Sequence, residues 1–286
     1  MKKIGKILAA NRSEIAIRIF RAAEESGIKT AAIYSKEDRF AIHRFKTDES
    51  YLVGEGKGPI QAYLDIDSII KIAKDAKVDA IHPGYGFLSE SPELAEQCEK
   101  NDITFIGPSK EILKRFGNKT EAKKVAEEAK VGTVPSVLVT KENLKSVEKE
   151  VEKIGYPVIV KASWGGGGRG MRVVRSSNEL IDQITTAQSE SLKAFGKDEV
   201  FIEKFLEDAA HIEVQILGDR HGNILHLFER DCSLQRRHQK IIERAPAHFL
   251  ENKTREEICN AAIKIAKQVK YFGAGTVEFL FDKKSG

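Results

Sequence analysis

The chain has 286 residues, of which 41% are hydrophobic and 31% charged, the profile of an ordinary globular protein. This length exceeds that of one typical core and predicts two or three domains. The net charge of +4 comes from lysines mixed with acidic residues along amphipathic segments, which indicates a solvated surface and argues against nucleic-acid binding. No segment approaches the roughly 18 consecutive apolar residues that a membrane span needs. Three widely spaced cysteines without a C-x-x-C motif favour a reducing cytoplasm.

The first third alternates strand-like and helix-like segments, which predicts a Rossmann-like α/β domain with a parallel sheet and helices on both faces. Residues 4–10 are an apolar run, and the spacing after them predicts a helix over 13–26 with Ser13 as its N-cap. Further strands are expected at 29–34, 79–81 and 103–106, and further helices at 67–76 and 92–100. The first turn, AANRSEIA, lacks the glycines of G-x-G-x-x-G, so we expect no dinucleotide site there.

A helix is expected at 119–130, and the pattern after it predicts a small α+β unit followed by antiparallel strands. The α+β unit is expected to hold strands at 136–139, 157–161, 171–174 and 200–203 and helices at 141–154 and 178–194. A hairpin with its turn at DRHGN follows from His211, and a helix at 254–269 and a strand at 276–281 end the chain. The predicted domains are a Rossmann-like domain (1–117), a connecting helix (118–135), a lid (136–205) and the start of an antiparallel subdomain (206–286).

The stretch KASWGGGGRGM lies between two apolar strands, so it closes a hairpin within one small domain and is not a linker between domains. It is not a Walker A loop either, because it leads into another strand and lacks the Lys-Ser/Thr ending. Backbone amides of such a loop can bind an anion, and Lys161 at the end of the first strand adds a cation. The pattern favours phosphate binding, with a structural loop as the alternative.

Three further segments carry candidate site residues. FIEKFLE places Glu203 and Lys204 at the end of an apolar strand, where backbone groups could pair with an adenine edge, but for this segment alone an ordinary edge strand is the preferred interpretation. ERDCSLQRRHQK combines arginine, lysine and histidine in a way that suits an oxyanion or phosphate, with a solvated basic turn as the alternative. GTVEFLF places Glu278 on the sheet face opposite Val277 and Phe279, where a carboxylate is usually paired or bound to a metal such as Mg²⁺.

Taken together, these strings resemble one family throughout the chain. KILAANRSEIAIR, AIHPGYGFLSE, FIGPS, GYPVIVKAS, GGGGRGMR, ERDCSLQRRHQK and GAGTVEFLF occur in the order found in the biotin carboxylase component of biotin-dependent carboxylases, a branch of the ATP-grasp superfamily. The set is very specific, whereas the glycine loop alone is weak. Within this family, the segment HRFKTDESY and the aromatic Trp164 before the glycines are most similar to those of bacterial pyruvate carboxylases. The biotin carboxylase subunit of acetyl-CoA carboxylase is the alternative.

The resemblance implies a set of site residues around ATP. Those near the phosphates are Lys119, Lys161, Gly167 and Gly168; those near the adenine are Glu203, Lys204, Phe205 and Leu206; and those around the rest of the nucleotide are His211, Gln235 and His238. It also implies that Lys240 contacts bicarbonate, with His238 as the second catalytic residue, and that Glu278 binds Mg²⁺ or Mn²⁺. His82 is expected to shape a loop, and Cys232 is not expected to act as a nucleophile, because no third group orients it towards a base.

The implied reaction phosphorylates bicarbonate with ATP and carboxylates biotin on a carrier domain. The implied partners are bicarbonate, the carrier domain and the remaining carboxylase domains, in a homo-oligomer. The family's second metal carboxylate, catalytic arginine and biotin pocket do not occur within the 286 residues, so we expect an N-terminal fragment with weak or absent turnover. A non-catalytic nucleotide-binding module and another ATP-grasp ligase, such as a carbamoyl-phosphate-type enzyme, are the alternatives.

Overall fold

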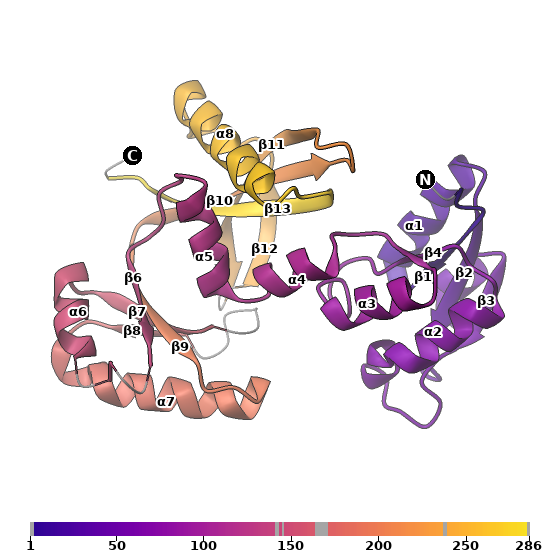
Figure 1. Cartoon of the computed structure of the whole chain (residues 1–286), viewed down its shortest axis with the longest axis horizontal. Coiled ribbons are helices and arrows are strands. Elements are labelled where there is room, and N and C mark those ends of the chain that lie inside the picture. The colour runs from indigo at the N-terminus through magenta and orange to yellow at the C-terminus, as the bar shows by residue number, and fades with distance from the viewer. Residues whose placement is uncertain (1–2, 141–142, 145, 164–170, 237–238, 285–286) are drawn as a thin grey trace. The chain divides into compact units, whose positions relative to one another are not determined.

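The computed structural model describes residues 3–140, 143–144, 146–163, 171–236 and 239–284. The chain divides into two compact units, Met1–Lys114 and Arg115–Gly286, which follow one another along the colour scale of Figure 1. Among the described residues, none of the helices combines the length and apolar character that crossing a membrane requires.

The first unit is built on a five-stranded parallel sheet in the order β3-β2-β1-β4-β5. Its strands are β1 (Lys6–Ala9), β2 (Lys29–Tyr34), β3 (Glu49–Leu52), β4 (Ala80–His82) and β5 (Thr104–Phe105). Its helices are α1 (Ser13–Glu25), α2 (Ile66–Asp75), α3 (Pro92–Lys100) and the short 3₁₀ helices η1 (Ile42–Phe45) and η2 (Gln61–Leu64). Helix α4 (Lys110–Phe116) crosses the boundary between the units.

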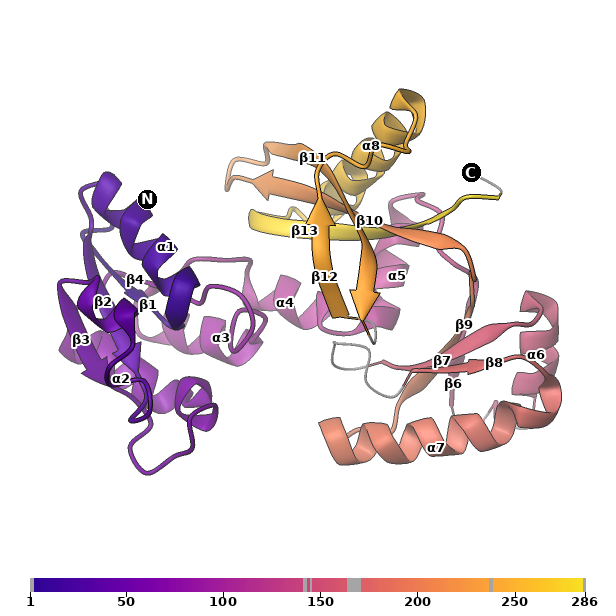
Figure 2. The same cartoon turned by 180° about the vertical axis from the view of Figure 1, so that it is seen from behind.

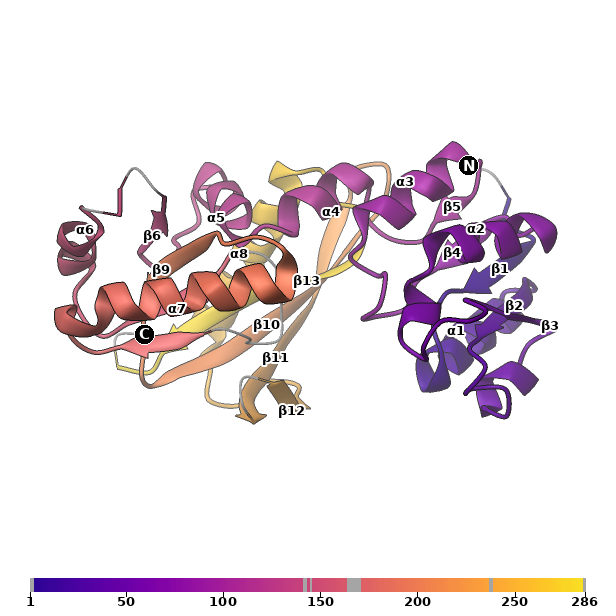
Figure 3. The same ribbon diagram turned by 90° about the horizontal axis from the view of Figure 1, so that it is seen from below.

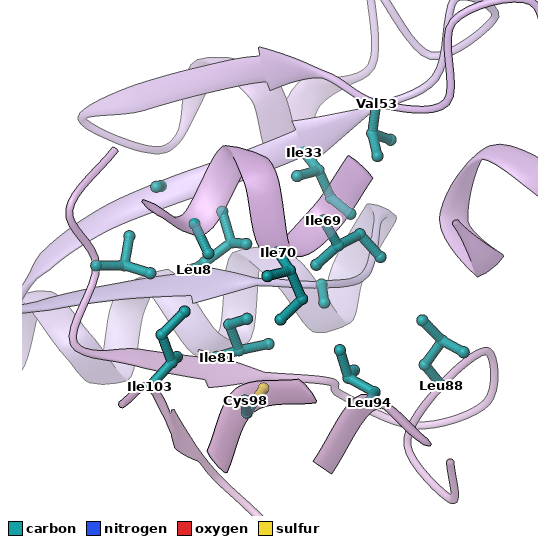
Figure 4. Packing of buried hydrophobic residues seen from close by; sticks show 14 of the residues in the cluster. Leu8, Ile33, Val53, Ile69, Ile70, Ile81, Leu88, Leu94, Cys98 and Ile103 are labelled. Carbon is teal, nitrogen blue, oxygen red and sulfur yellow. The ribbon is translucent and has the colours of Figure 1, made fainter. Parts of the chain in front are cut away.

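Side chains alternate across this sheet and pack on helices at both faces. Leu8 lies on the face where Ile69 of α2 and Leu94 of α3 complete the core, as Figure 4 shows. Ile7 lies on the opposite face and packs with Phe20 of α1. The predicted parallel sheet with helices on both faces is therefore confirmed.

The prediction that Ser13 caps α1 is wrong. Helix α1 begins at Ser13 itself, and the N-cap residue Arg12 makes no side-chain capping bond. The polar side chain that organises this turn is Asn11, whose amide donates to the carbonyl oxygens of Pro83 and Tyr85 at 2.8 Å each. In the same loop, Nδ1 of His82 accepts from the Gly84 amide at 3.0 Å, which confirms the loop-shaping role expected for that histidine.

Gly54 follows β3 and is expected to tolerate no side chain. Its φ is +61°, and a Cβ atom there would lie 2.4 Å from Cα of Ala62. Gly54→Ala should therefore destabilise the first unit by about 2–4 kcal/mol, the sum of left-handed strain and overpacking. Thermal unfolding followed by circular dichroism measures the loss. Gly56→Ala is the matched control, because its φ of +80° carries the same strain but its Cβ would meet nothing within 4 Å. Equal losses in the two variants would contradict the predicted clash.

The second unit contains two four-stranded antiparallel sheets, ordered β6-β9-β7-β8 and β12-β11-β10-β13. Strands of the first sheet are β6 (Ser136–Val139), β7 (Val158–Ala162), β8 (Arg172–Val174) and β9 (Val200–Lys204). Strands of the second sheet are β10 (Ala209–Gly218), β11 (Ile224–Arg236), β12 (Gln239–Arg244) and β13 (Gly273–Asp282). The helices are α5 (Lys119–Glu128), α6 (Val147–Ile154), α7 (Ser177–Phe195) and α8 (Asn252–Gln268).

The sheet β6-β9-β7-β8 and helices α6 and α7 share one core, and Figure 3 shows α7 running along this sheet. Strands β7 and β8 pair directly with each other, which confirms that the glycine run connects two strands of one hairpin. The helix predicted over 141–154 instead begins at Val147. Asn143 explains the shortening, because its side chain accepts from the Thr140 amide at 2.8 Å and donates to the Leu138 carbonyl at 2.7 Å.

The sheet β12-β11-β10-β13 packs on α8 through one face, as Figures 1 and 2 show from opposite sides. Val214 and Ile216 of β10 and Val277 of β13 point towards Ala262 of this helix. The segment ERDCSLQRRHQK is not a basic turn over its described part. It continues β11 as far as Arg236, and β12 begins at Gln239.

Glu229 is the most deeply buried carboxylate of this sheet. Its side chain is 0% exposed, and its Oε1 atom accepts from Nε of Arg255 at 2.8 Å and from the Ala247 amide at 3.1 Å. Burial raises the pKa of the Glu229 carboxyl, but the Arg255 bond and the backbone amides outweigh burial and hold that pKa below its ordinary value of 4.5.

This lowered pKa predicts an acid-sensitive contribution to stability. A carboxyl with a lower pKa in the folded than in the unfolded state stabilises the fold above the unfolded pKa, and this stabilisation disappears as pH falls through the folded pKa. The difference in unfolding free energy between the wild type and Glu229→Gln should therefore be largest above about pH 5 and shrink below about pH 4.5. Urea unfolding from pH 7 to pH 3 measures this difference. Glu257→Gln, an exposed change on α8, should leave the pH profile unaltered; a constant difference for Glu229→Gln would refute the linkage.

Candidate functional site

A buried carboxylate on β9 joins two lysines from different elements. Glu203 is 5% exposed. Its Oε1 atom lies 3.0 Å from Nζ of Lys161 on β7, and its Oε2 atom lies 3.0 Å from Nζ of Lys123 on α5. Lys161 and Glu203 belong to neighbouring strands in which Ile159 lies opposite Glu203, so the two side chains form a diagonal pair on one sheet face.

Lys119 adds a third cation beside this cluster. It is the first residue of α5, whose N-cap Asn118 accepts from the Thr120 amide at 2.8 Å. Burial lowers the pKa of the Lys119 ammonium, and the positive charge of Lys161 lowers it further. Within the described ranges, no carboxylate forms an ion pair with Lys119. The lysines therefore carry more positive charge than Glu203 compensates, which suits a polyanion such as a phosphate chain.

The segment after Glu203 is less open than an edge strand. Strand β9 lies between β6 and β7, so the edge-strand alternative is wrong. The Lys204 amide donates to the Pro135 carbonyl at 2.9 Å and the Phe205 amide to the Pro157 carbonyl at 3.1 Å. The Lys204 ammonium donates to the carbonyl oxygens of Gly155 and Tyr156 at 3.0 Å each. These donors are used within the protein, so an adenine at this segment would have to use other backbone groups.

A second charged cluster crosses the sheet β12-β11-β10-β13. Glu278 on β13 lies opposite Glu213 on β10, which in turn lies opposite Arg230 on β11. Lys240 on β12 reaches both carboxylates: its Nζ atom bonds Glu213 and lies 2.6 Å from Oε1 of Glu278. Arg230 bonds the other oxygen of Glu213, and its Nε atom lies 3.3 Å from Glu243.

This cluster keeps its members charged. Burial raises the pKa of the Glu213 carboxyl, but the bonds from Lys240 and Arg230 more than reverse the effect, so the pKa lies below its ordinary value. Burial lowers the pKa of the Lys240 ammonium, and the bonds to Glu213 and Glu278 raise it well above its ordinary value. Lys240 is therefore a fixed cation that can hold an anion but cannot serve as a base near neutral pH.

The other predicted site residues in the described part of the chain are His211, Gln235 and Leu206. His211 lies two residues before Glu213 on β10, hence on the same face, and its amide donates to the Ser233 hydroxyl at 3.0 Å. Gln235 lies opposite Lys240, but its side-chain amide donates to the Cys232 carbonyl at 2.9 Å. Leu206 follows β9. The predicted residues that lie outside the described part of the chain are Trp164, Gly167, Gly168 and His238.

The described residues bear on two kinds of chemistry, nucleophilic attack by Cys232 and the binding of a metal ion. Cys232 is fully buried, and burial followed by the nearby charge of Glu213 raises the pKa of its thiol, which disfavours the reactive thiolate form. The described residues contain no group of three or more histidine, cysteine or acidic side chains that could hold a metal. A divalent cation bound to Glu278 would need further oxygen ligands from outside the protein, such as nucleotide phosphates and water.

Lys123 and Glu213 could have been predicted as site residues only in part, and neither was, whereas Arg230 lies in the basic segment ERDCSLQRRHQK without having been singled out. Glu213 stands in HIEVQIL, where a charged residue interrupts an apolar strand on the face opposite Ile212 and Val214. The same alternation identified Glu278, so this signal was available. Lys123 lies four residues after Lys119, on the same face of a helix, but nothing in the local sequence distinguishes it from the exposed lysines around it.

The fold is that of an ATP-grasp protein, and residues 118–286 match the family described as the carbamoyl-phosphate synthase L chain, ATP-binding domain. Residues 3–113 match the family described as the biotin carboxylase N-terminal domain. The chain thus belongs to the biotin carboxylase family.

The similar proteins are much longer than this chain. It is 57% identical over 279 residues to the pyruvate carboxylase of Bacillus subtilis, an alignment that covers 98% of this chain and 24% of that protein. Its structure resembles that of Rhizobium etli pyruvate carboxylase T882A with the allosteric activator acetyl coenzyme A (TM-score 0.93, 54% identity, covering 100% of this chain and 25% of that one). It also resembles the biotin carboxylase domain of Hydrogenobacter thermophilus 2-oxoglutarate carboxylase in complex with MgADP, ADP and bicarbonate (TM-score 0.95, 43% identity, covering 100% and 63%).

Proposed function

We propose that this chain forms the nucleotide-binding part of a biotin carboxylase that acts within a pyruvate carboxylase. ATP would phosphorylate bicarbonate to carboxyphosphate with release of ADP, and the carbon dioxide formed from it would be transferred to N1 of biotin on a carrier domain. The observation that carries the proposal is the pair of charged clusters: Lys123 and Lys161 paired with Glu203 beside Lys119, and Lys240 between Glu213 and Glu278.

The two clusters divide the work of phosphoryl transfer. Lys119 and Lys161 would hold the phosphates, because their two positive charges exceed the single negative charge of the carboxylate beside them. Gly167 and Gly168 would cover the phosphates, and the segment from Glu203 through Lys204 and Phe205 to Leu206 would lie along the adenine. Lys240 would bind bicarbonate as a fixed cation, with His211, Gln235 and His238 around the nucleotide.

Glu278 fits a magnesium or manganese ion shared with the phosphates. Its side chain is 64% exposed, and of the described residues Lys240 alone forms an ion pair with it. A hard divalent cation prefers such oxygen ligands and would neutralise charge that develops on the phosphates during transfer.

The proposal also covers the cellular compartment, the partners and the final carboxyl acceptor. All three cysteines are free and buried, which fits a reducing cytoplasm. Bicarbonate, a biotin carrier domain and the other domains of the carboxylase would be its partners, in a homo-oligomer. Pyruvate would be the final carboxyl acceptor, as the name of the Bacillus subtilis relative suggests.

A chimera tests the proposed activity. This chain would replace the aligned segment of the Bacillus subtilis pyruvate carboxylase, to which it is 57% identical. Bicarbonate should then stimulate ATP hydrolysis by the chimera, and Lys240→Met should abolish the stimulation. A folded chimera that binds MgATP but hydrolyses it at the same rate with and without bicarbonate would overturn the proposed reaction.

A further inference from the structure

Lys123 differs from the other two lysines in how its ammonium is used. Its Nζ atom lies 3.0 Å from Oε2 of Glu203 and donates to the Val134 carbonyl at 2.6 Å. It also lies 5.7 Å from the centre of the Phe201 ring. The side chain is 19% exposed. These contacts occupy Lys123 within the protein, so it is placed to hold Glu203 and not to bind a ligand itself.

Lys161 contacts the other oxygen of the same carboxylate, also at 3.0 Å. The single negative charge of Glu203 is therefore divided between two ammonium groups. Without Lys123, the buried carboxylate would pair with Lys161 alone, and a phosphate would have to compete with Glu203 for that cation. With Lys123 present, the competition is weaker and Glu203 still orients Lys161.

We propose that Lys123 is a positioning residue for nucleotide binding, which acts through the shared Glu203 carboxylate to leave Lys161 available to phosphate. The inference rests on the proposed nucleotide-binding function. It assigns a role on α5 to a residue that would not touch the nucleotide.

Calorimetric titration with MgATP tests the inference, with each variant made in the chimera in which this chain replaces the aligned segment of the Bacillus subtilis pyruvate carboxylase. Lys123→Met, which keeps the aliphatic stem and removes the charge, should raise the Kd roughly ten- to a hundredfold, the range typical of residues that orient a binding group from behind. Lys123→Arg should bind within about threefold of the wild type, because it keeps a cation that can bridge to Glu203. Lys124→Met is the matched control: this neighbour is 61% exposed and pairs with Glu121, so its loss should leave the Kd unchanged.

A double-mutant cycle with Glu203→Gln separates positioning from a simple change in net charge. If Lys123 acts through Glu203, the double variant should bind no more weakly than the weaker single variant, whereas independent effects would multiply. Circular dichroism establishes that each variant is folded. Should Lys123→Met not fold, Lys123→Gln replaces it, because it removes the charge but keeps a polar hydrogen-bond donor on the side chain.

The outcomes distinguish this inference from the function on which it rests. A folded chimera with the unchanged chain that binds no MgATP would overturn the proposed function. Binding that is lost in Lys161→Met but unchanged in Lys123→Met, or in Lys123→Gln where that variant replaces it, would overturn the inference alone. Multiplicative effects in the cycle would also overturn it, because Lys123 would then act independently of Glu203.

Discussion

Arg255→Met is expected to destabilise the unit Arg115–Gly286 by about 3–5 kcal/mol, because it removes the cation from a fully buried carboxylate. Glu229 has no exposed side-chain surface, and its Oε2 atom already lacks a hydrogen-bond partner among the described residues. Once Arg255 is gone, the Ala247 amide would be the remaining donor to Oε1. Urea unfolding followed by circular dichroism measures the loss.

Two variants make this result specific. Lys253→Met, an exposed change on the same helix, should alter the unfolding free energy by no more than about 0.5 kcal/mol. The double variant Arg255→Met with Glu229→Gln should recover part of the stability, because it removes the stranded charge. A loss below about 1 kcal/mol in Arg255→Met would show that Glu229 does not depend on this pair.

Lys161→Met is expected to weaken MgATP binding roughly a hundredfold, because a partly buried cation would be lost from the proposed phosphate site while Glu203 stays. The remaining carboxylate would then repel the phosphates, with Lys123 as its only partner in the cluster. Calorimetric titration measures the Kd. Lys193→Met removes the same charge from an exposed position on α7 and should bind like the wild type. A change of less than about threefold in Lys161→Met would argue against a phosphate site here.

Elements with strong apolar periodicity and clear end signals could be predicted from the sequence to the residue. β2 (Lys29–Tyr34), α3 (Pro92–Lys100) and β6 (Ser136–Val139) all have their predicted bounds. β12 was missed because all six of its residues are exposed, so pairing with β11 holds it in place and leaves no alternating apolar pattern. β3 was missed because its four residues ESYL form an edge strand that pairs with β2 alone.

In the candidate site, too, features set by one segment could be predicted, whereas contacts between segments could not. Glu278 could be placed on its sheet face from alternation along one strand, and the structure gives it an ion-pair partner there. The contact that links Lys123 to Lys161 could not be predicted, since it depends on how helix α5 packs against strands β7 and β9. Periodicity along a single segment carries no information about such a contact.

The pairing of β10 with β13 has a consequence for how this region can vary over evolution. The two strands pair without interruption over ten residues, with Glu213 and Glu278 on one face and Val214 and Val277 on the other. Deletion of a single residue within either strand would turn its carboxylate towards α8 and its valine towards the charged cluster. Gaps of one residue should therefore be absent from the middle of both strands in functional relatives, whereas the DRHGN turn can change length.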